Sequence, residues 1–435
     1  MISRLAAGGG RLYGNGATFQ WSSMMPSPRS QKKGPPHLQR DSQKWFFDWM
    51  VKETGKVFHF QPDGRGRIPR SVRSHDMISK HMGQAARRIE RLAQAEAEAG
   101  HRETALELYY QATLQYHDAQ HVVFETNDEK RFLHGALMRC YGKVREFSPY
   151  KIEHVDVKWN GTVVSGNLHL APGDGRKPLV FYVPGCDQTK EAWPHPYYNQ
   201  ALQRGMHVFS FDGPGQGESN LRGIRLTADN YEEAASAAIG ELVKRPEVDP
   251  KKIGVYALSF GSHWGMRIAA KDHRIAAAAA PWASYVDKYY LFNEESPGYK
   301  QLFASLTQSE SEEALDKVVA EMTMEGLMEK IACPTLLTTG EYDPRAPLEE
   351  VLRLFDQMKA PAELWLMPDQ FHNGSVTGTA RSSVWEADIH AFVCDWLRER
   401  FEGKPVKHAG KVIYLEPSGA GPNAANVSFK RRWFD

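Results

Sequence analysis

The sequence of 435 residues contains little cysteine and almost no net charge. Its four cysteines, Cys140, Cys186, Cys333 and Cys394, are too widely separated to suggest a metal site or a dense disulfide framework. Such usage is typical of free thiols in a reducing compartment and predicts a cytoplasmic protein. The formal net charge of +1 provides no global field that would favour nucleic acid, so we expect no nucleic-acid partner.

Long apolar runs are also missing. The longest, from Ile275 to Trp282, is mostly alanine and falls well short of the ~20 residues that span a bilayer. We therefore expect no membrane association. Hydrophobic residues make up 41% of the chain and charged residues 25%, as in an ordinary globular protein.

The most informative motif surrounds Ser259. An apolar, β-rich run from Lys252 to Leu258 ends at this serine, and a helical pattern from His263 to Lys271 follows at once. Small residues, Ala257 and Gly261, flank the serine at two residues on either side. This pattern predicts a nucleophile elbow, a sharp turn that exposes the serine hydroxyl above a sheet. The usual first glycine is replaced by Ala257, and an ordinary strand-to-helix turn is the alternative interpretation.

Two later strand ends supply partners for this serine. Asp343 follows the apolar run 333–340, and His372 follows the run 362–367. A serine hydroxyl needs a base to take its proton and a carboxylate to orient that base. The order serine, aspartate, histidine is the one used by α/β-hydrolases. We predict Ser259, Asp343 and His372 as a catalytic triad; a turn aspartate and a surface histidine are the alternatives.

A third strand end offers donors for an oxyanion. The apolar run 178–183 leads into Pro184-Gly185, where glycine permits close approach of a substrate. The backbone N–H of Phe260 is predicted to pair with that of Cys186 or Asp187. The sequence does not choose between these two. Cys186 itself is interpreted as a packing residue rather than a nucleophile.

A glycine-rich segment runs from Asp212 to Ser219 and follows another strand candidate, 206–211. Its glycines are two residues apart, and no acidic residue ends a strand about 20 residues later, so it does not match a dinucleotide-binding loop. We therefore predict no organic cofactor, and no metal.

Taken together, these segments resemble the α/β-hydrolase superfamily, and within it the FrsA-like esterase group. The resemblance rests on Pro184-Gly185 with Thr189-Lys190-Glu191, the turn 212–217, the Ser259 elbow, 340–343 and Phe371-His372. It covers about residues 150–400. It implies a mostly parallel central sheet flanked by helices, with an N-terminal helical domain and a helical cap insertion. It also implies a serine hydrolase that cleaves carbon–carbon bonds next to a carbonyl, or esters, in aromatic or polyketide-like compounds.

The rest of the chain is predicted to form accessory parts. Residues 1–41 are expected to be a disordered extension or to precede the true start at Met24 or Met25; Gly8–Gly10 and Pro35-Pro36 disfavour a transit peptide. Residues 42–149 are predicted as a helical lid domain, 150–402 as the catalytic domain with a cap at about 284–331, and 403–435 as a C-terminal extension containing an added strand, 411–415.

Helical periodicity supports the lid. Apolar residues at three- and four-residue spacing predict one amphipathic helix through Ile78, Met82, Ala85, Ala86, Ile89 and Leu92. A second helix is predicted over 104–119, separated from the first by Gly100. In the cap, Asp287, Glu294 and Glu295 are candidates for an auxiliary acid in carbon–carbon cleavage, with solvated surface charges as the alternative.

The sequence thus predicts a hydrolase that acts on a small molecule through Ser259. Three alternatives stay open: a carboxylesterase of broader specificity, an acyltransferase using the same triad, and a non-catalytic ligand-binding protein of this fold. The resemblance also favours a homodimer.

Overall fold

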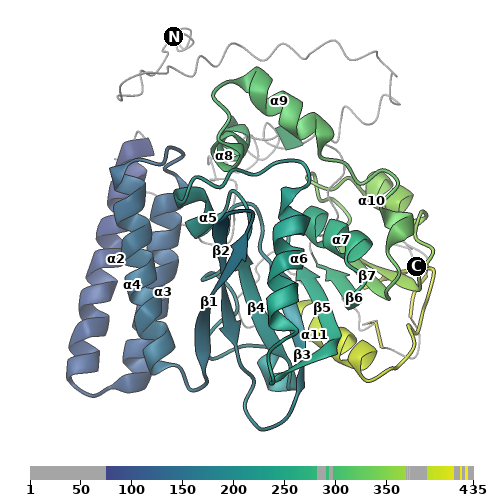
Figure 1. The fold of residues 1–435 in the computed structure, drawn as a ribbon, viewed down its shortest axis with the longest axis horizontal. Helices are drawn as coiled ribbons and strands as arrows, with labels where there is room; N and C mark the ends of the chain where they lie inside the picture. The colour runs from purple at the N-terminus through teal and green to yellow at the C-terminus, as the bar shows by residue number, and fades with distance from the viewer. Residues whose placement is uncertain are drawn as a thin grey trace.

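The computed structural model describes residues 75–281, 291–292, 297–368, 370, 372, 389–415, 422–423 and 427–429. Its centre is a nine-stranded sheet with the strand order β1-β2-β4-β3-β5-β6-β7-β8-β9 (Figure 1). Strand β2 pairs antiparallel with β1 on one side and with β4 on the other, and all other neighbouring strands pair in parallel. Their bounds are β1 Ile152–Trp159, β2 Thr162–His169, β3 Lys177–Val183, β4 His207–Asp212, β5 Val248–Ala257, β6 Ile275–Ala280, β7 Thr335–Gly340, β8 Ala362–Met367 and β9 Lys411–Tyr414.

Helices cover both faces of this sheet. One face packs against α6 (Asn230–Leu242), α7 (Gly261–Lys271) and α10 (Leu348–Phe355), and the other against η2 (Leu202–Arg204) and α11 (Ile389–Phe401). The parallel strands are buried on both sides, which explains why they read as continuous apolar runs in the sequence. The prediction of a mostly parallel sheet flanked by helices is confirmed.

The N-terminal helical region is present as a bundle of α2 (His75–Glu98), α3 (Arg102–His121) and α4 (Asp128–Phe147). The bundle has its own apolar core and stands beside β1 and β2 in Figure 1. Gly100 joins α2 to α3 with φ +83°, a conformation that glycine adopts without strain. The prediction for Leu92 was wrong: its side chain is 57% exposed, and Ala93 takes the buried position one residue later.

A second helical region lies between β6 and β7. It contains the short pair Leu291-Phe292, then α8 (Pro297–Thr307), α9 (Glu312–Glu321) and η4 (Met328–Lys330). In Figure 1 α8 and α9 lie above the edge of the sheet from which α5 (Gly217–Leu221) also emerges. Because α5 follows the end of β4, this is the carboxyl edge of the parallel strands. The predicted added strand near the C-terminus is β9.

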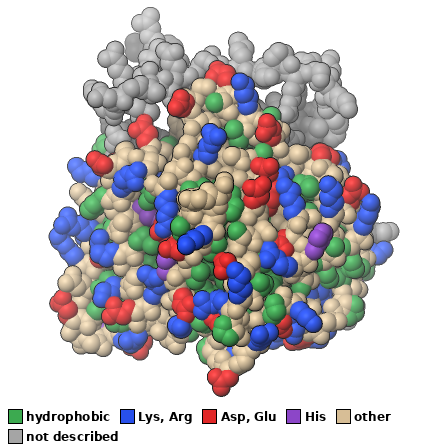
Figure 2. Space-filling view, in the orientation of Figure 1, with side chains coloured by type: hydrophobic (Ala, Val, Ile, Leu, Met, Phe, Trp, Pro, Cys, Tyr) green, Lys and Arg blue, Asp and Glu red, His purple; other side chains and the backbone are tan. Residues whose placement is uncertain are grey.

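The surface carries both signs of charge. Figure 2 shows Lys and Arg side chains interspersed with Asp and Glu across the visible face, in keeping with the net charge of +1. In the part of the chain that the structure describes, no helix combines the length and apolarity needed to cross a membrane. Residues 1–74, and with them the predicted extension 1–41, lie outside the described ranges.

Candidate active site

Ser259 occupies a strained turn between β5 and α7. Its φ is +54°, a left-handed value that is uncommon for a residue with a side chain. Gly261 must be glycine here, because a Cβ would lie 2.4 Å from the Pro184 carbonyl oxygen. Strain of this kind persists only where surrounding structure enforces it, and it is frequent at functional sites. The turn at Ser259 therefore has the sharp strand-to-helix geometry of an elbow.

The alanine that departs from the usual elbow pattern has a compensating partner. Ala257 faces Gly265, which lies one turn into α7, and a Cβ at Gly265 would lie 2.4 Å from the Cβ of Ala257. The close approach of α7 to β5 therefore requires a glycine on one side only. In this chain the glycine is on the helix.

Ser259 is joined to both predicted partners. Its Oγ lies 2.8 Å from Nε2 of His372, and Nδ1 of His372 lies 2.7 Å from Oδ2 of Asp343. The Asp343 side chain is fully buried, and its Oδ1 accepts a hydrogen bond of 2.9 Å from the N–H of Arg345. Both carboxylate oxygens are thus occupied. The arrangement can orient the imidazole and let it accept the serine proton.

Backbone hydrogen bonds hold the two loops that carry Asp343 and His372. The N–H of Glu341 donates to Met367, and the N–H of Tyr342 donates to Gln370, at 3.0 and 2.9 Å. These bonds continue the β7–β8 pairing beyond the strand ends. They bring together residues 29 positions apart in the sequence.

The predicted oxyanion residues also lie around Ser259. A Cβ at Gly185 would lie 3.3 Å from the Cβ of Ser259, so the turn that follows β3 passes directly beside the serine. Cys186 and Phe260 are buried and Asp187 is half-buried. The thiol of Cys186 lies 3.0 Å from the Tyr299 hydroxyl on α8, in keeping with a packing role.

Helix α8 covers this region with aromatic side chains. The Phe303 ring packs edge-on against Phe260 with centroids 4.7 Å apart, and Phe292 packs edge-on against Phe303 at 4.8 Å. The guanidinium of Arg345 lies 5.1 Å from the centre of the Tyr299 ring. The insertion between β6 and β7 thus contacts Phe260, the residue after the nucleophile, and also Cys186 and Arg345 in two other loops of the site.

A buried ion cluster stands behind the turn that follows β3. Lys190 is completely buried, and its ammonium group contacts Glu191, Asp212 and Glu218 at 2.6, 3.0 and 2.8 Å. Burial alone would lower the pKa of Lys190, but the three carboxylates outweigh it and hold the pKa above its ordinary value. The cluster ties the Thr189-Lys190-Glu191 segment to the turn after β4.

Sequence reasoning overlooked two residues near this site. Arg345 is two positions after Asp343 and is buried, and Gln216 lies within the glycine-rich turn after β4 and is also buried. A buried arginine has no local sequence signal. Gln216 stood inside a motif that had been noted, but only the tertiary structure shows what its amide contacts.

The auxiliary-acid candidates Asp287, Glu294 and Glu295 lie outside the described residues. Over the described ranges, no three His, Cys, Asp or Glu side chains are grouped so that they could hold a metal ion.

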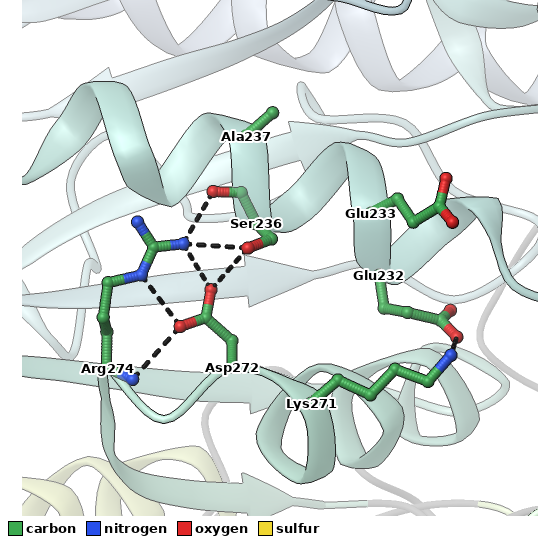
Figure 3. Close-up of a pocket in the computed structure, with 7 residues that line it drawn as sticks. All are labelled: Glu232, Glu233, Ser236, Ala237, Lys271, Asp272 and Arg274. Atoms are coloured by element: carbon green, nitrogen blue, oxygen red, sulfur yellow. Dashed lines mark hydrogen bonds and ion pairs between the residues drawn. The ribbon is translucent and has the colours of Figure 1, made fainter.

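A surface pocket of about 570 Å³ lies between α6 and α7 (Figure 3). It is lined by Glu232, Glu233, Ser236, Ala237, Lys271, Asp272 and Arg274. Lys271 pairs with Glu232, Arg274 pairs with Asp272, and the Ser236 hydroxyl donates a hydrogen bond to Asp272. Lys271 ends α7, whereas Ser259 precedes its first residue, so the helix separates the pocket from the triad by about 15 Å. This pocket contains none of the predicted site residues.

Comparisons with known proteins agree with the fold. A model of the prolyl oligopeptidase family matches residues 197–400. The 2,6-dihydropseudooxynicotine hydrolase of Paenarthrobacter nicotinovorans is 29% identical over 272 residues, which cover 62% of this chain and 72% of that protein. Esterase FrsA of Escherichia fergusonii is 27% identical over 218 residues, 48% of this chain and 51% of its own length.

Solved structures give the same result. The crystal structure of the 2,6-dihydroxy-pseudo-oxynicotine hydrolase superposes with a TM-score of 0.67 at 24% identity, covering 84% of this chain and 98% of that one. The chain therefore has the α/β-hydrolase fold. It is a hydrolase, and its relatives include a 2,6-dihydropseudooxynicotine hydrolase and an esterase FrsA.

Proposed function

We propose that this protein hydrolyses a carbon–carbon bond next to a carbonyl group in an aromatic or polyketide-like small molecule, with Ser259, His372 and Asp343 as its catalytic triad. The observation that supports this most directly is the continuous hydrogen-bonded path from the Ser259 hydroxyl through His372 to the buried Asp343. The relationship to a 2,6-dihydropseudooxynicotine hydrolase favours carbon–carbon cleavage. The relationship to FrsA keeps ester hydrolysis as the second candidate.

In the proposed mechanism His372 Nε2 takes the Ser259 proton while the oxygen attacks the substrate carbonyl carbon. The oxyanion that forms accepts hydrogen bonds from the N–H of Phe260 and from that of Cys186 or Asp187. Asp343 keeps Nδ1 protonated and stabilises the imidazolium. Collapse of the intermediate breaks the carbon–carbon bond, and the electron pair leaves on the departing carbon.

The departing carbon must be protonated, and His372 carries the proton taken from Ser259. This step leaves an acyl group on Ser259 and a ketone as the first product. Water, activated by His372, then attacks the acyl-enzyme and releases an acid. For an ester the same steps release an alcohol in place of the ketone.

The substrate class is supported by the aromatic character of the cover. Phe303 packs against Phe260, Phe292 packs against Phe303, and the Tyr299 hydroxyl contacts the Cys186 thiol. Aromatic side chains form favourable edge and stacked contacts with aromatic ligands. We further propose that one carboxylate among Asp287, Glu294 and Glu295 assists protonation of the leaving carbon. Its replacement by the amide should slow diketone cleavage more than ester hydrolysis.

The test is a paired assay on purified wild type and Ser259→Ala. Each is offered a short p-nitrophenyl ester and an aryl 1,3-diketone, and the products are identified by mass. Ser236→Ala is the matched control, because it makes the same substitution on α6 in the pocket of Figure 3 and should retain full activity. We expect the diketone to give an acid and a ketone, and Ser259→Ala to lose this reaction.

Other outcomes identify the alternatives. Ester turnover alone, lost in Ser259→Ala, would indicate a carboxylesterase. A product carrying the acyl group on an added alcohol or amine would indicate an acyltransferase. Full activity in Ser259→Ala would refute the triad, and binding of an aromatic diketone without turnover would favour a ligand-binding protein.

We also propose that the protein is a cytoplasmic homodimer. The chain has only four cysteines, all of them buried and widely separated in the sequence, a usage typical of proteins in a reducing compartment. Sedimentation equilibrium of the full chain should give twice the monomer mass of 49.2 kDa, and a single-chain mass would contradict the dimer.

A further inference from the structure

Gln216 connects the turn after β4 to the turn beside the nucleophile. Its side chain is buried, and its Nε2 donates to the carbonyl oxygens of Gly185 at 2.8 Å and Gln188 at 3.3 Å. Its Oε1 accepts a hydrogen bond of 2.7 Å from the Tyr231 hydroxyl. The donors face carbonyls and the acceptor faces a hydroxyl, so the partners fix the orientation of the amide.

The two carbonyls bound by Gln216 mark the ends of one tight turn. The N–H of Gln188 donates to the Gly185 carbonyl at 3.0 Å and closes this turn, and the Tyr182 hydroxyl donates to the Gln188 side chain at 3.0 Å. The same turn passes beside Ser259, since a Cβ at Gly185 would lie 3.3 Å from the serine Cβ. Gln216 thus holds the backbone immediately next to the reacting hydroxyl.

The carbonyl of Gly185 and the N–H of Cys186 belong to the same peptide unit. Because a trans peptide is planar, its C=O and N–H point in opposite directions, and fixing one fixes the other. The N–H of Asp187 belongs to the next peptide, whose carbonyl Gln216 does not bind. Resting on the proposed function, we propose that Gln216 is a positioning residue that aims the Cys186 N–H at the substrate oxyanion. Cys186, and not Asp187, then supplies the second donor.

Gln216 is also linked to the first donor. The Tyr231 ring stacks on Trp264 with centroids 4.2 Å apart, and Trp264 packs edge-on against Phe260 at 5.0 Å. A Cβ at Gly213 would lie 2.3 Å from the Tyr231 ring, so glycine in this motif is what lets the tyrosine reach Gln216. One buried chain of contacts therefore joins the two peptide units that are proposed to hold the oxyanion.

The test compares Gln216→Met with wild type. Methionine keeps the length and the burial of the side chain but donates no hydrogen bond. Loss of an oxyanion donor typically lowers the rate about a hundred- to a thousandfold, and loosening one should cost about ten- to a hundredfold. We expect this loss in kcat with KM changed less than about twofold, because the oxyanion exists only after Ser259 has added to the carbonyl.

Inhibition by phenyl trifluoromethyl ketone supplies a readout that a merely structural role would not change. This ketone adds to an active-site serine and forms an oxyanion, so its inhibition constant should rise by about the factor lost in kcat. Asn199→Leu is the matched control: Asn199 is an equally buried amide in the connection after β3, and its Oδ1 accepts from the N–H of Leu202 at 3.0 Å. We expect it to lower stability without that parallel change in inhibition.

Gln216→Glu gives a second variant. A carboxylate there would face two carbonyl oxygens and could donate only when protonated, so the ratio of variant to wild-type kcat should increase as the pH falls from 8 to 5.5. The inference is overturned if Gln216→Met keeps kcat within twofold of wild type, or if kcat falls while the inhibition constant does not change. Full activity of Ser259→Ala would instead overturn the proposed function itself, so the two failures are distinguishable.

Discussion

The contact between Ala257 and Gly265 predicts a strong coupling between two small residues under the elbow. In Gly265→Ala the new Cβ would lie 2.4 Å from that of Ala257 and 3.0 Å from Cγ1 of Val255. Carbon atoms pack at about 3.5–4.0 Å, so β5 and α7 must separate by about an ångström. Overpacking of this kind lowers the free energy of unfolding by about 1–3 kcal/mol. The better helix propensity of alanine offsets about 1 kcal/mol of this loss.

The reverse substitution removes the obstruction. Ala257→Gly alone should cost about 1 kcal/mol, through the lost buried methyl and the greater freedom of the unfolded chain. In the double variant Ala257→Gly/Gly265→Ala the methyl group moves from the strand to the helix, and the two changes compensate. We expect a coupling free energy of about 1–2 kcal/mol.

Urea denaturation of the four proteins measures this coupling, and ester or diketone turnover measures the position of the elbow. Separation of α7 from β5 would displace the Phe260 N–H from Ser259, so Gly265→Ala should also lower kcat, and the double variant should restore most of it. Additivity of the two single changes within about 0.5 kcal/mol, with kcat unchanged throughout, would refute the steric argument.

The remaining predictions concern charge. Asp343→Asn should lower kcat by about three to four orders of magnitude, because the amide cannot stabilise the imidazolium. The amide keeps the packing, so the urea midpoint should change little. Steady-state kinetics and a urea titration measure the two quantities. Lys190→Met should lower the free energy of unfolding by about 3–5 kcal/mol, because three carboxylates lose their buried cation. Urea titrations at several pH values should show that this loss becomes smaller as the carboxylates are protonated. A loss of stability that does not depend on pH would contradict an electrostatic role for the cluster. Burial lowers the pKa of His134 to about 4 and that of His169 to about 3, so the unfolded chain binds more protons below pH 6.5. Stability should therefore fall from pH 6.5 towards 4, by about 3 kcal/mol for His134, and His134→Gln should flatten the pH profile.

The sequence was sufficient to predict the central strands because buried parallel strands are continuous apolar runs with abrupt polar ends. The run 362–367 coincides with β8. His372, after β8, contacts Ser259, and Asp343, after β7, contacts His372. One readable signal was missed. Asn160-Gly161 separates two alternating segments and forms the β1–β2 hairpin, with φ +46° and +75°.

The helical bundle shows where periodicity is a weaker guide. A repeat of three and four residues places a helix correctly but leaves the buried face uncertain by about one residue, and Leu92 and Ala93 exchanged roles for this reason. The bundle lies beside β1 and β2, a position that periodicity does not encode.

What the sequence determined by itself was the order of strand ends and the chemistry of the residues that follow them. This order defines a hydrolase fold and nominates Ser259, Asp343 and His372, because strands that pair in parallel bring their carboxyl ends to one edge. Only the tertiary structure decided which side chains act across that edge. The contacts of Gln216 with Gly185, and of Gly265 with Ala257, join segments whose spacing in the chain carries no information about their distance in space.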